Sequence, residues 1–129
     1  MAVDLNLERF ELYCLARQYS RVAWGIFKKL PKQIQYMTGA QFLESADSVQ
    51  ANLAEAYGRF HFKDKRNFEY HARGSLLESL SWSEILIERG FIETQEHQAL
   101  KTIGQSITFK LNSHIRFLTD QIESSKSQS

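Results

Sequence analysis

One stretch of the sequence, residues 57–73 (YGRFHFKDKRNFEYHAR), mixes basic and aromatic side chains at short spacing. Basic groups neutralise phosphates while aromatic rings stack on unpaired bases, so this mixture is typical of a surface that binds single-stranded nucleic acid. The alternative is a solvated turn, because Phe60 and Phe68 also continue the apolar stripes of the flanking segments. The basic residues of this candidate site are Arg59, Lys63, Lys65, Arg66 and Arg73.

A second basic cluster, Lys28, Lys29 and Lys32, surrounds the single proline, Pro31. In the antiparallel bundle expected below, this cluster lies at the end opposite residues 59–73. One chain therefore cannot merge the two clusters into a single patch. A ring of several copies would still gather either cluster around its axis and make a weak nucleic-acid-binding patch multivalent.

Residues that could carry catalysis lack the spacing that catalysis requires. Carboxylate-bridged metal sites in bundles use paired Glu-x-x-His motifs, and Glu69 and His71 do not have this spacing. The chain has no H-E-x-x-H motif, phosphate-binding glycine loop or nucleophile elbow. His71 and His114 fall near apolar stripes and are expected to be hydrogen-bonded core or interface residues, and Cys14 a buried thiol. We expect no enzymatic activity, no metal site and no cofactor.

Residues 41–59 carry a polar stripe beside an apolar one. Both stripes repeat every three or four positions, so they lie about 100° apart on one helix. The polar residues are mostly small or amide-bearing, unlike the Lys and Glu of a solvated face. We expect them to be buried or half-buried and to fix the register of neighbouring helices. A partner or nucleic-acid surface built from Asn52, Glu55 and Arg59, or plain solvent exposure, are the alternatives. The polar stripe comprises Gln41, Ser45, Ser48, Asn52, Glu55 and Arg59.

Gly74 and Ser75 extend this interpretation to the next helix. A glycine inside a helix costs about 0.5–1 kcal/mol relative to alanine, which suggests that something approaches Gly74 too closely for a methyl group. We expect the helix of residues 38–58 to make this approach, with Glu78 within reach of Arg59. On this interpretation, Gly74→Leu disrupts the bundle or its assembly.

The composition indicates one soluble globular domain. The chain has 129 residues, 43% hydrophobic and 24% charged, with a formal net charge of +1. It therefore lacks the basic excess of dedicated nucleic-acid binders. The N-terminal residues MAVDLNLERF indicate neither a signal peptide nor a membrane-spanning run, so we expect a cytoplasmic protein without a membrane partner.

Helices must position these residues, because a 3.6-residue apolar period runs through the chain between a few breakpoints. The first helix is expected to end before Pro31. The second is expected to begin at Thr38, where Thr38 and Gln41 fit a capping box, and to end at Gly58.

Asp64 is the expected N-cap of the third helix, Gly90 its end, and Thr94 the cap of the fourth. Short connections between four helices predict an up-down-up-down antiparallel bundle. Its domain spans residues 1–123, followed by a disordered polar tail at residues 124–129. The turns at Pro31 and Gly90 then lie at one end, and the turn near Phe62 lies at the other end with both termini.

The first helix carries a second apolar stripe, formed by Phe10, Tyr13, Trp24 and Phe27, beside its main one. Two stripes on one helix suggest two burial partners. Because aromatic residues often anchor subunit contacts, this stripe favours oligomerisation.

From the second helix onward the sequence resembles one bacterial family, the four-helix-bundle proteins encoded in intervening sequences of large-subunit ribosomal RNA genes. The resemblance runs from about Phe27 to Leu118 in order, spacing and residue type. The residues that carry it are Gln41, Ala46, Ser48, Val49, Asn52, Leu53, Ala54, Glu55, Gly58, Arg59, Phe68, Ala72, Gly74, Ser75 and Glu78.

The resemblance implies a bundle assembled as a ring-shaped homopentamer, without enzymatic activity. The accessory protein of diversity-generating retroelements is more distantly similar, and it engages a reverse transcriptase and nucleic acid. Leu43 and Glu44 stand where the family commonly has two arginines, which weakens an RNA-binding role. Gln50 and Ala56 replace a family proline and glycine, so this helix is expected to be straighter.

The sequence therefore predicts an all-α four-helix bundle that acts as a non-enzymatic oligomeric scaffold. An accessory role in RNA or reverse-transcriptase-linked processes is implied by the resemblance. The alternative is a nucleic-acid-binding module that works directly through residues 59–73. The expected partners are other copies of the chain and RNA, DNA or a reverse transcriptase.

Overall fold

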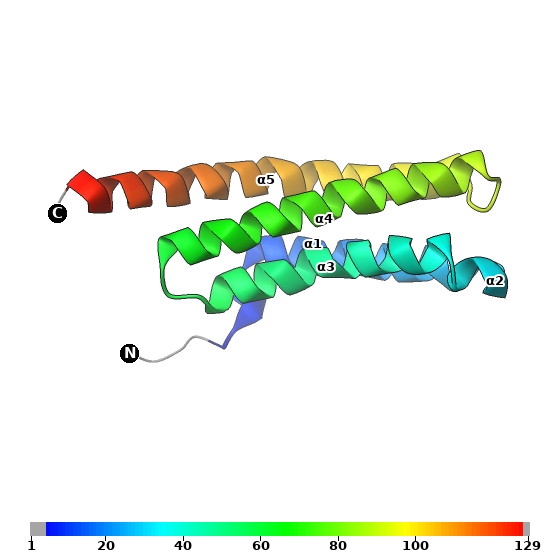
Figure 1. The fold of residues 1–129 in the computed structure, drawn as a ribbon, viewed down its shortest axis with the longest axis horizontal. Helices are drawn as coiled ribbons and strands as arrows, with labels where there is room; N and C mark the ends of the chain where they lie inside the picture. The colour runs from blue at the N-terminus through cyan, green and yellow to red at the C-terminus, as the bar shows by residue number, and fades with distance from the viewer. Residues whose placement is uncertain (1–4, 128–129) are drawn as a thin grey trace.

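The computed structural model describes residues 5–127, and its regular elements are all helical within that range (Figure 1). The predicted all-α class is therefore confirmed. A single-turn helix after Pro31 was not predicted. The elements are η1 (Leu7–Arg9), α1 (Glu11–Phe27), α2 (Lys32–Gln35), α3 (Thr38–Gly58), α4 (Phe62–Glu88) and α5 (Thr94–Ser127).

Two helix starts differ from expectation. Thr38 is the first residue of α3, and Met37 takes the cap position without a side-chain hydrogen bond, so the predicted capping box is wrong. Helix α4 begins at Phe62, with His61 as its N-cap, so Asp64 is not the cap. Asp64 lies in the first turn instead, where its carboxylate interacts favourably with the positive end of the helix dipole.

The turn between α4 and α5 forms where the sequence predicts it. Gly90 has a φ of 78°, in the left-handed region that glycine tolerates at the end of a helix. Thr94 is the first residue of helix α5 rather than its cap, so that prediction is also wrong. Helix α5 continues through Ser127, so residues 124–127 are helical rather than a disordered tail. Residues 128–129 of the predicted tail lie outside the described residues.

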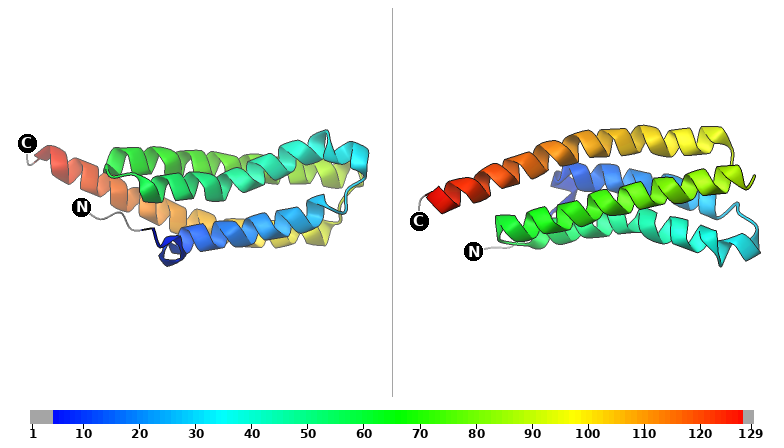
Figure 2. Two further views of the ribbon diagram at one scale, coloured as in Figure 1. Left: turned by 90° about the horizontal axis from the view of Figure 1, so that it is seen from below. Right: turned by 45° about the horizontal axis from the view of Figure 1, so that its top comes forward.

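The four long helices form the predicted up-down-up-down bundle. Each contacts two neighbours in the cyclic order α1, α3, α4, α5, and the contact between α3 and α4 is the most extensive. Helix α2 and the Gly90 turn lie at one end, while the α3–α4 turn and the end of α5 lie at the other (Figures 1 and 2). Helix α5 is the longest, with 34 residues, and projects beyond the α3–α4 turn (Figure 2).

Small residues occupy many positions of the core, so the helices approach closely. Tyr19 and Phe42 are the two largest fully buried side chains. Burial raises the pKa of Tyr19 to about 12. Its hydroxyl donates a hydrogen bond of 2.6 Å to Ser79, because Ser79 already donates to the carbonyl of Leu76. The small buried residues are Ala16, Ala23, Gly39, Ser45, Ala46, Ala56, Ala72, Ser79, Ser83 and Gly104.

The predicted close approach at Gly74 is wrong. A Cβ atom added at Gly74 would meet no atom within 4 Å. The close approaches occur at two other glycines. A Cβ at Gly39 would lie 2.7 Å from the backbone oxygen of Ile34, and one at Gly104 would lie 3.5 Å from Leu76. The α1–α3 connection therefore packs against α3 only because residue 39 lacks a side chain.

We predict opposite effects for two glycine-to-alanine substitutions. Gly39→Ala forces the backbone around Ile34 to move and is expected to lower the free energy of unfolding by about 1–3 kcal/mol. Gly74→Ala has open space and is expected to raise it by about 0.5–1 kcal/mol. Urea denaturation followed by circular dichroism measures both. Equal effects of the two substitutions would contradict the packing described here.

Candidate functional site

The basic segment, residues 59–73, forms the α3–α4 turn and the first turns of α4. Lys65, one of its expected phosphate ligands, points inward. Its Nζ donates to the carbonyl oxygens of Ala56 and Tyr57, both at 3.2 Å, and so caps the end of α3. Burial lowers the pKa of Lys65, and the nearby Glu69 carboxylate partly offsets this effect. Lys65 is half-buried, and its charge is engaged in stabilising the turn.

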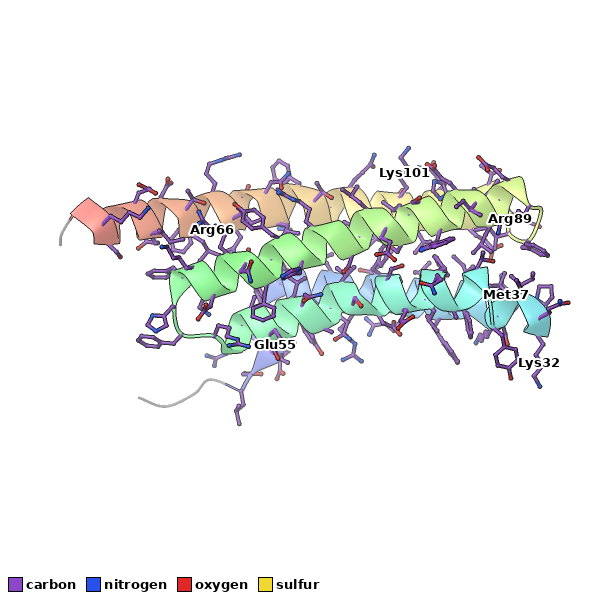
Figure 3. The ribbon with its side chains drawn as sticks, in the orientation of Figure 1. Lys32, Met37, Glu55, Arg66, Arg89 and Lys101 are labelled. Atoms are coloured by element: carbon purple, nitrogen blue, oxygen red, sulfur yellow. The ribbon has the colours of Figure 1, made fainter. Side chains whose placement is uncertain are left out.

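Two further cations of the segment are bound to α5. Arg66 donates to the hydroxyl of Thr119 at 3.1 Å, and Arg73 donates to Asn112 Oδ1 at 2.9 Å. Both guanidinium groups also lie over the ring of Tyr70, at 5.8 and 5.2 Å from its centroid. Figure 3 places Arg66 beside α5. These contacts hold α4 against α5 and occupy the groups that were expected to bind phosphate.

The most exposed aromatic residue of the segment lies at its tip. Phe60 is 69% exposed, and His61, Phe62 and Lys63 are exposed beside it. An open groove of about 480 Å³ is lined by His61, Phe62, Lys63 and the C-terminal part of α5. Arg59 lies behind this tip, paired with Glu55 at 3.2 Å and stacked over a ring of α4.

The second basic cluster lies at the opposite end of the bundle, as predicted; Figure 3 shows Lys32 and Arg66 at opposite ends. Lys28 and Lys32 are exposed. Lys29 forms an ion pair of 2.7 Å with Glu96, and its hydrogen bond lowers the pKa of that carboxyl. One cation of this cluster is therefore engaged within the chain.

The residues of the polar stripe on α3 differ in how far they are buried. Ser45 is buried and Ser48 and Asn52 are half-buried, in agreement with the prediction. All three donate to carbonyl groups of their own helix, so they do not fix the register of neighbouring helices. Gln41 and Glu55 are exposed in a single chain, as is Arg59.

The polar residues predicted on α4 are also mainly exposed. Ser75 is half-buried, whereas Gly74 and Glu78 are exposed. Glu78 accepts a hydrogen bond from Trp82 Nε1 at 3.3 Å rather than reaching Arg59. The predicted contact between Glu78 and Arg59 is therefore wrong.

Sequence analysis missed the buried pair between Glu69 and His114. Glu69 is 1% exposed, and its Oε2 lies 2.6 Å from His114 Nδ1. Its second oxygen is buried without a hydrogen-bond partner. The imidazole ring also lies 5.8 Å from Phe10, which stacks on Tyr57 at 5.3 Å. A buried carboxylate requires a partner, and His114 supplies it from α5. Through the contact of His114 with Phe10, the pair joins α4, α5 and the start of α1.

Of the remaining candidate residues, some have the environment that the sequence predicts and others do not. His114 is hydrogen-bonded as predicted, whereas His71 is exposed. Cys14 is exposed rather than buried, so that prediction is wrong. A serine–histidine contact does exist, between Ser83 Oγ and His97 Nδ1 at 2.7 Å. Ser83 is fully buried, so its hydroxyl cannot reach a substrate and the contact joins α4 to α5.

The molecule is thus an antiparallel four-helix bundle whose internal polar groups are used in packing. Among residues 5–127, none of the helices combines the length and the hydrophobicity that a membrane span requires. The model of the 23S rRNA-intervening sequence protein family matches residues 8–113, and the chain belongs to this family.

A solved structure from Bacteroides thetaiotaomicron, a protein of unknown function from the S23 ribosomal protein family, has the same fold. It superposes with a TM-score of 0.75 at 23% identity and covers 81% of this chain and 97% of its own. No curated protein matches the chain.

We predict that breaking the Glu69–His114 pair is more harmful than replacing it. His114→Ala leaves the buried carboxylate without its partner and is expected to lower the free energy of unfolding by about 3 kcal/mol. Adding Glu69→Met to that variant removes the buried charge and is expected to restore most of the loss. Urea denaturation gives both values.

His71→Ala is the matched control, because His71 is an exposed histidine of α4. Its effect is expected to stay within about 0.5 kcal/mol. If His114→Ala is no more destabilising than His71→Ala, the pair does not hold the helices together.

Proposed function

We propose that the chain is a non-enzymatic oligomeric scaffold that assembles as a ring-shaped homopentamer. The observation that carries this proposal is the apolar surface left uncovered on a single bundle. Phe109, Leu77 and Trp24 are 77, 63 and 51% exposed, respectively. Large exposed apolar side chains of this kind are typical of subunit contacts.

These residues lie on three different helices, α5, α4 and α1, so uncovered apolar surface occurs on more than one side of the bundle. A ring provides two neighbours for every copy, which a simple pair does not. The predicted second stripe of α1 contributes to this surface through Trp24, which stacks on Phe27 at 5.7 Å. Phe10 of that stripe packs within the chain against Tyr57.

We further propose an accessory role of this scaffold in RNA or reverse-transcriptase-linked processes. Membership of the intervening-sequence family supports a link to ribosomal RNA genes. Repetition of the exposed α3–α4 tip around a ring would present several copies of Phe60, Phe62 and Lys63, and multivalency strengthens weak contacts.

Direct nucleic-acid binding by one chain is the second candidate function. It is favoured by the exposed ring of Tyr70, which has the guanidinium groups of Arg66 and Arg73 against it. The hydrogen bonds of both arginines to α5 weigh against it, because these groups are already engaged.

We predict that light scattering at micromolar concentration gives five times the mass of one chain. The exposed apolar residues supply the reason, since their burial in the assembly is favourable by about 25 cal/mol per Å². A monomer would overturn the scaffold, and a different closed oligomer would overturn the pentamer alone.

We predict that any binding of a fluorescent single-stranded RNA weakens steeply as salt rises, because phosphate contacts release counterions. Lys63→Glu at the exposed tip is expected to lower the affinity at least about tenfold, and Lys101→Glu, an exposed cation of α5, to leave it unchanged. Lys65→Glu is unsuitable because it removes the cap of α3. Salt-independent binding would exclude this mechanism.

A further inference from the structure

On the face formed by α1 and α3, the basic residues lie on α1 and the acidic residues lie on α3. The chain has no acidic residue from Leu12 to Leu43, whereas residues 44–58 contain Glu44, Asp47 and Glu55 and no basic residue. Helices α1 and α3 are neighbours in the bundle and lie side by side in Figure 2. A basic helix therefore lies next to an acidic helix on one face of the molecule.

The exposed residues of each helix form a single stripe on this face. Their spacings of three and four residues keep them on one side of a helix. All of them are exposed in a single chain. The basic stripe consists of Arg17, Arg21 and Trp24 of α1 and of Lys28 at its C-cap, and the acidic stripe on α3 consists of Glu44, Asp47, Ala51 and Glu55.

An open groove of about 590 Å³ lies between the two stripes. Arg17, Arg21 and Trp24 line it from α1, and Asp47 and Gln50 line it from α3, so these residues lie at similar heights along the bundle. Within residues 5–127, Arg21 and Asp47 form no ion pair with each other or with another residue. Both charges are therefore available to a second molecule.

We propose that copies of this chain associate side by side, with the basic stripe of one bundle packed on the acidic stripe of the next and Arg21 paired with Asp47 of the neighbouring copy. Because the groove residues share one height, parallel bundles bring these charges together without sliding along their axes. Trp24, 51% exposed at the centre of the basic stripe, supplies the apolar anchor, and Ala51 leaves space in the facing stripe.

The charges also exclude the competing arrangements. Packing α1 on α1 would place Arg17, Arg21 and Lys28 against copies of themselves. Packing α3 on α3 would oppose Glu44 and Asp47 to their copies, whereas Glu55 is already paired with Arg59. Like charges across an interface disfavour association, whereas opposite charges favour it and fix the register. This inference rests on the proposed function, because it names one contact of the oligomer, the one that covers Trp24; Leu77 and Phe109 lie outside both stripes.

Two charge reversals test the contact, Arg21→Asp and Asp47→Arg. Each variant alone is expected to associate at least about tenfold more weakly, because two like charges then face each other. An equimolar mixture of the variants is expected to recover association, since each substituted position can face an opposite charge on the other copy. Sedimentation velocity over a concentration series gives both results.

The mixture also separates contact between copies from contact within one chain. If Arg21 and Asp47 interact only within a chain, combining both substitutions in one chain restores association but mixing the single variants does not, and the proposal fails. When the two variants alternate in a pair or in an even-numbered ring, every contact brings opposite charges together. A ring with an odd number of copies keeps one contact between like charges, so its association recovers less completely.

Arg89→Asp is the control, because Arg89 is an exposed cation at the end of α4 outside both stripes, and it is expected to leave the mass unchanged. Circular dichroism verifies that each variant remains helical. If the unsubstituted chain is a monomer, the scaffold itself fails. If the unsubstituted chain and both variants are equally oligomeric, the scaffold stands and this interface is wrong.

Discussion

Close approach of the four long helices is the constraint on which the rest of the structure depends. Alanine, glycine and serine occupy many of the buried positions, between larger leucine and isoleucine side chains. Among the nine phenylalanines only Phe42 is fully buried, and neither tryptophan is. Some of the other aromatic side chains are half-buried against the core, and others, including Phe109 and Trp24, remain exposed. The uncovered apolar surface that supports self-association is therefore a consequence of how the core is packed.

The same core brings polar groups inside, and these are paired between helices. Tyr19 bonds to Ser79 across the bundle, and Ser83 to His97 and Glu69 to His114 between α4 and α5. Such bonds are directional, so they set the register of α4 against α5. The serines of α3 bond to their own backbone instead. Between α3 and α4, Lys65 donates hydrogen bonds to the last carbonyl groups of α3, and side-chain packing holds the two helices together along the rest of this contact.

Much of this architecture can be predicted from the local pattern of apolar residues and helix breakers. The predictions that are wrong share one cause. Apolar periodicity, Pro31 and Gly90 predict the helices and the ends at which their turns lie, because these features act within one segment. The exposure of Cys14 and the free space at Gly74 depend on which face meets which neighbour, and periodicity alone does not give this. The Glu69–His114 pair had a usable signal: Glu69 falls on the apolar stripe of α4, and both residues are at nearly equal distances from Gly90. A charge at a core position requires a partner at the same height.

For locating a binding surface on this chain, the pairing of each charge is more informative than the net charge or the local density of charged residues. The densest basic segment, residues 59–73, is largely committed to its own fold, since Lys65, Arg66 and Arg73 bind the ends and sides of neighbouring helices. The charges of α1 are more widely spaced, yet Arg21 has no partner in the described part of the chain and faces an acidic helix. Desolvating a charge is favourable only when it gains a partner, so charges already paired within the fold offer little to a ligand. The charges left without partners, beside an exposed tryptophan, identify the surface that a second copy can cover.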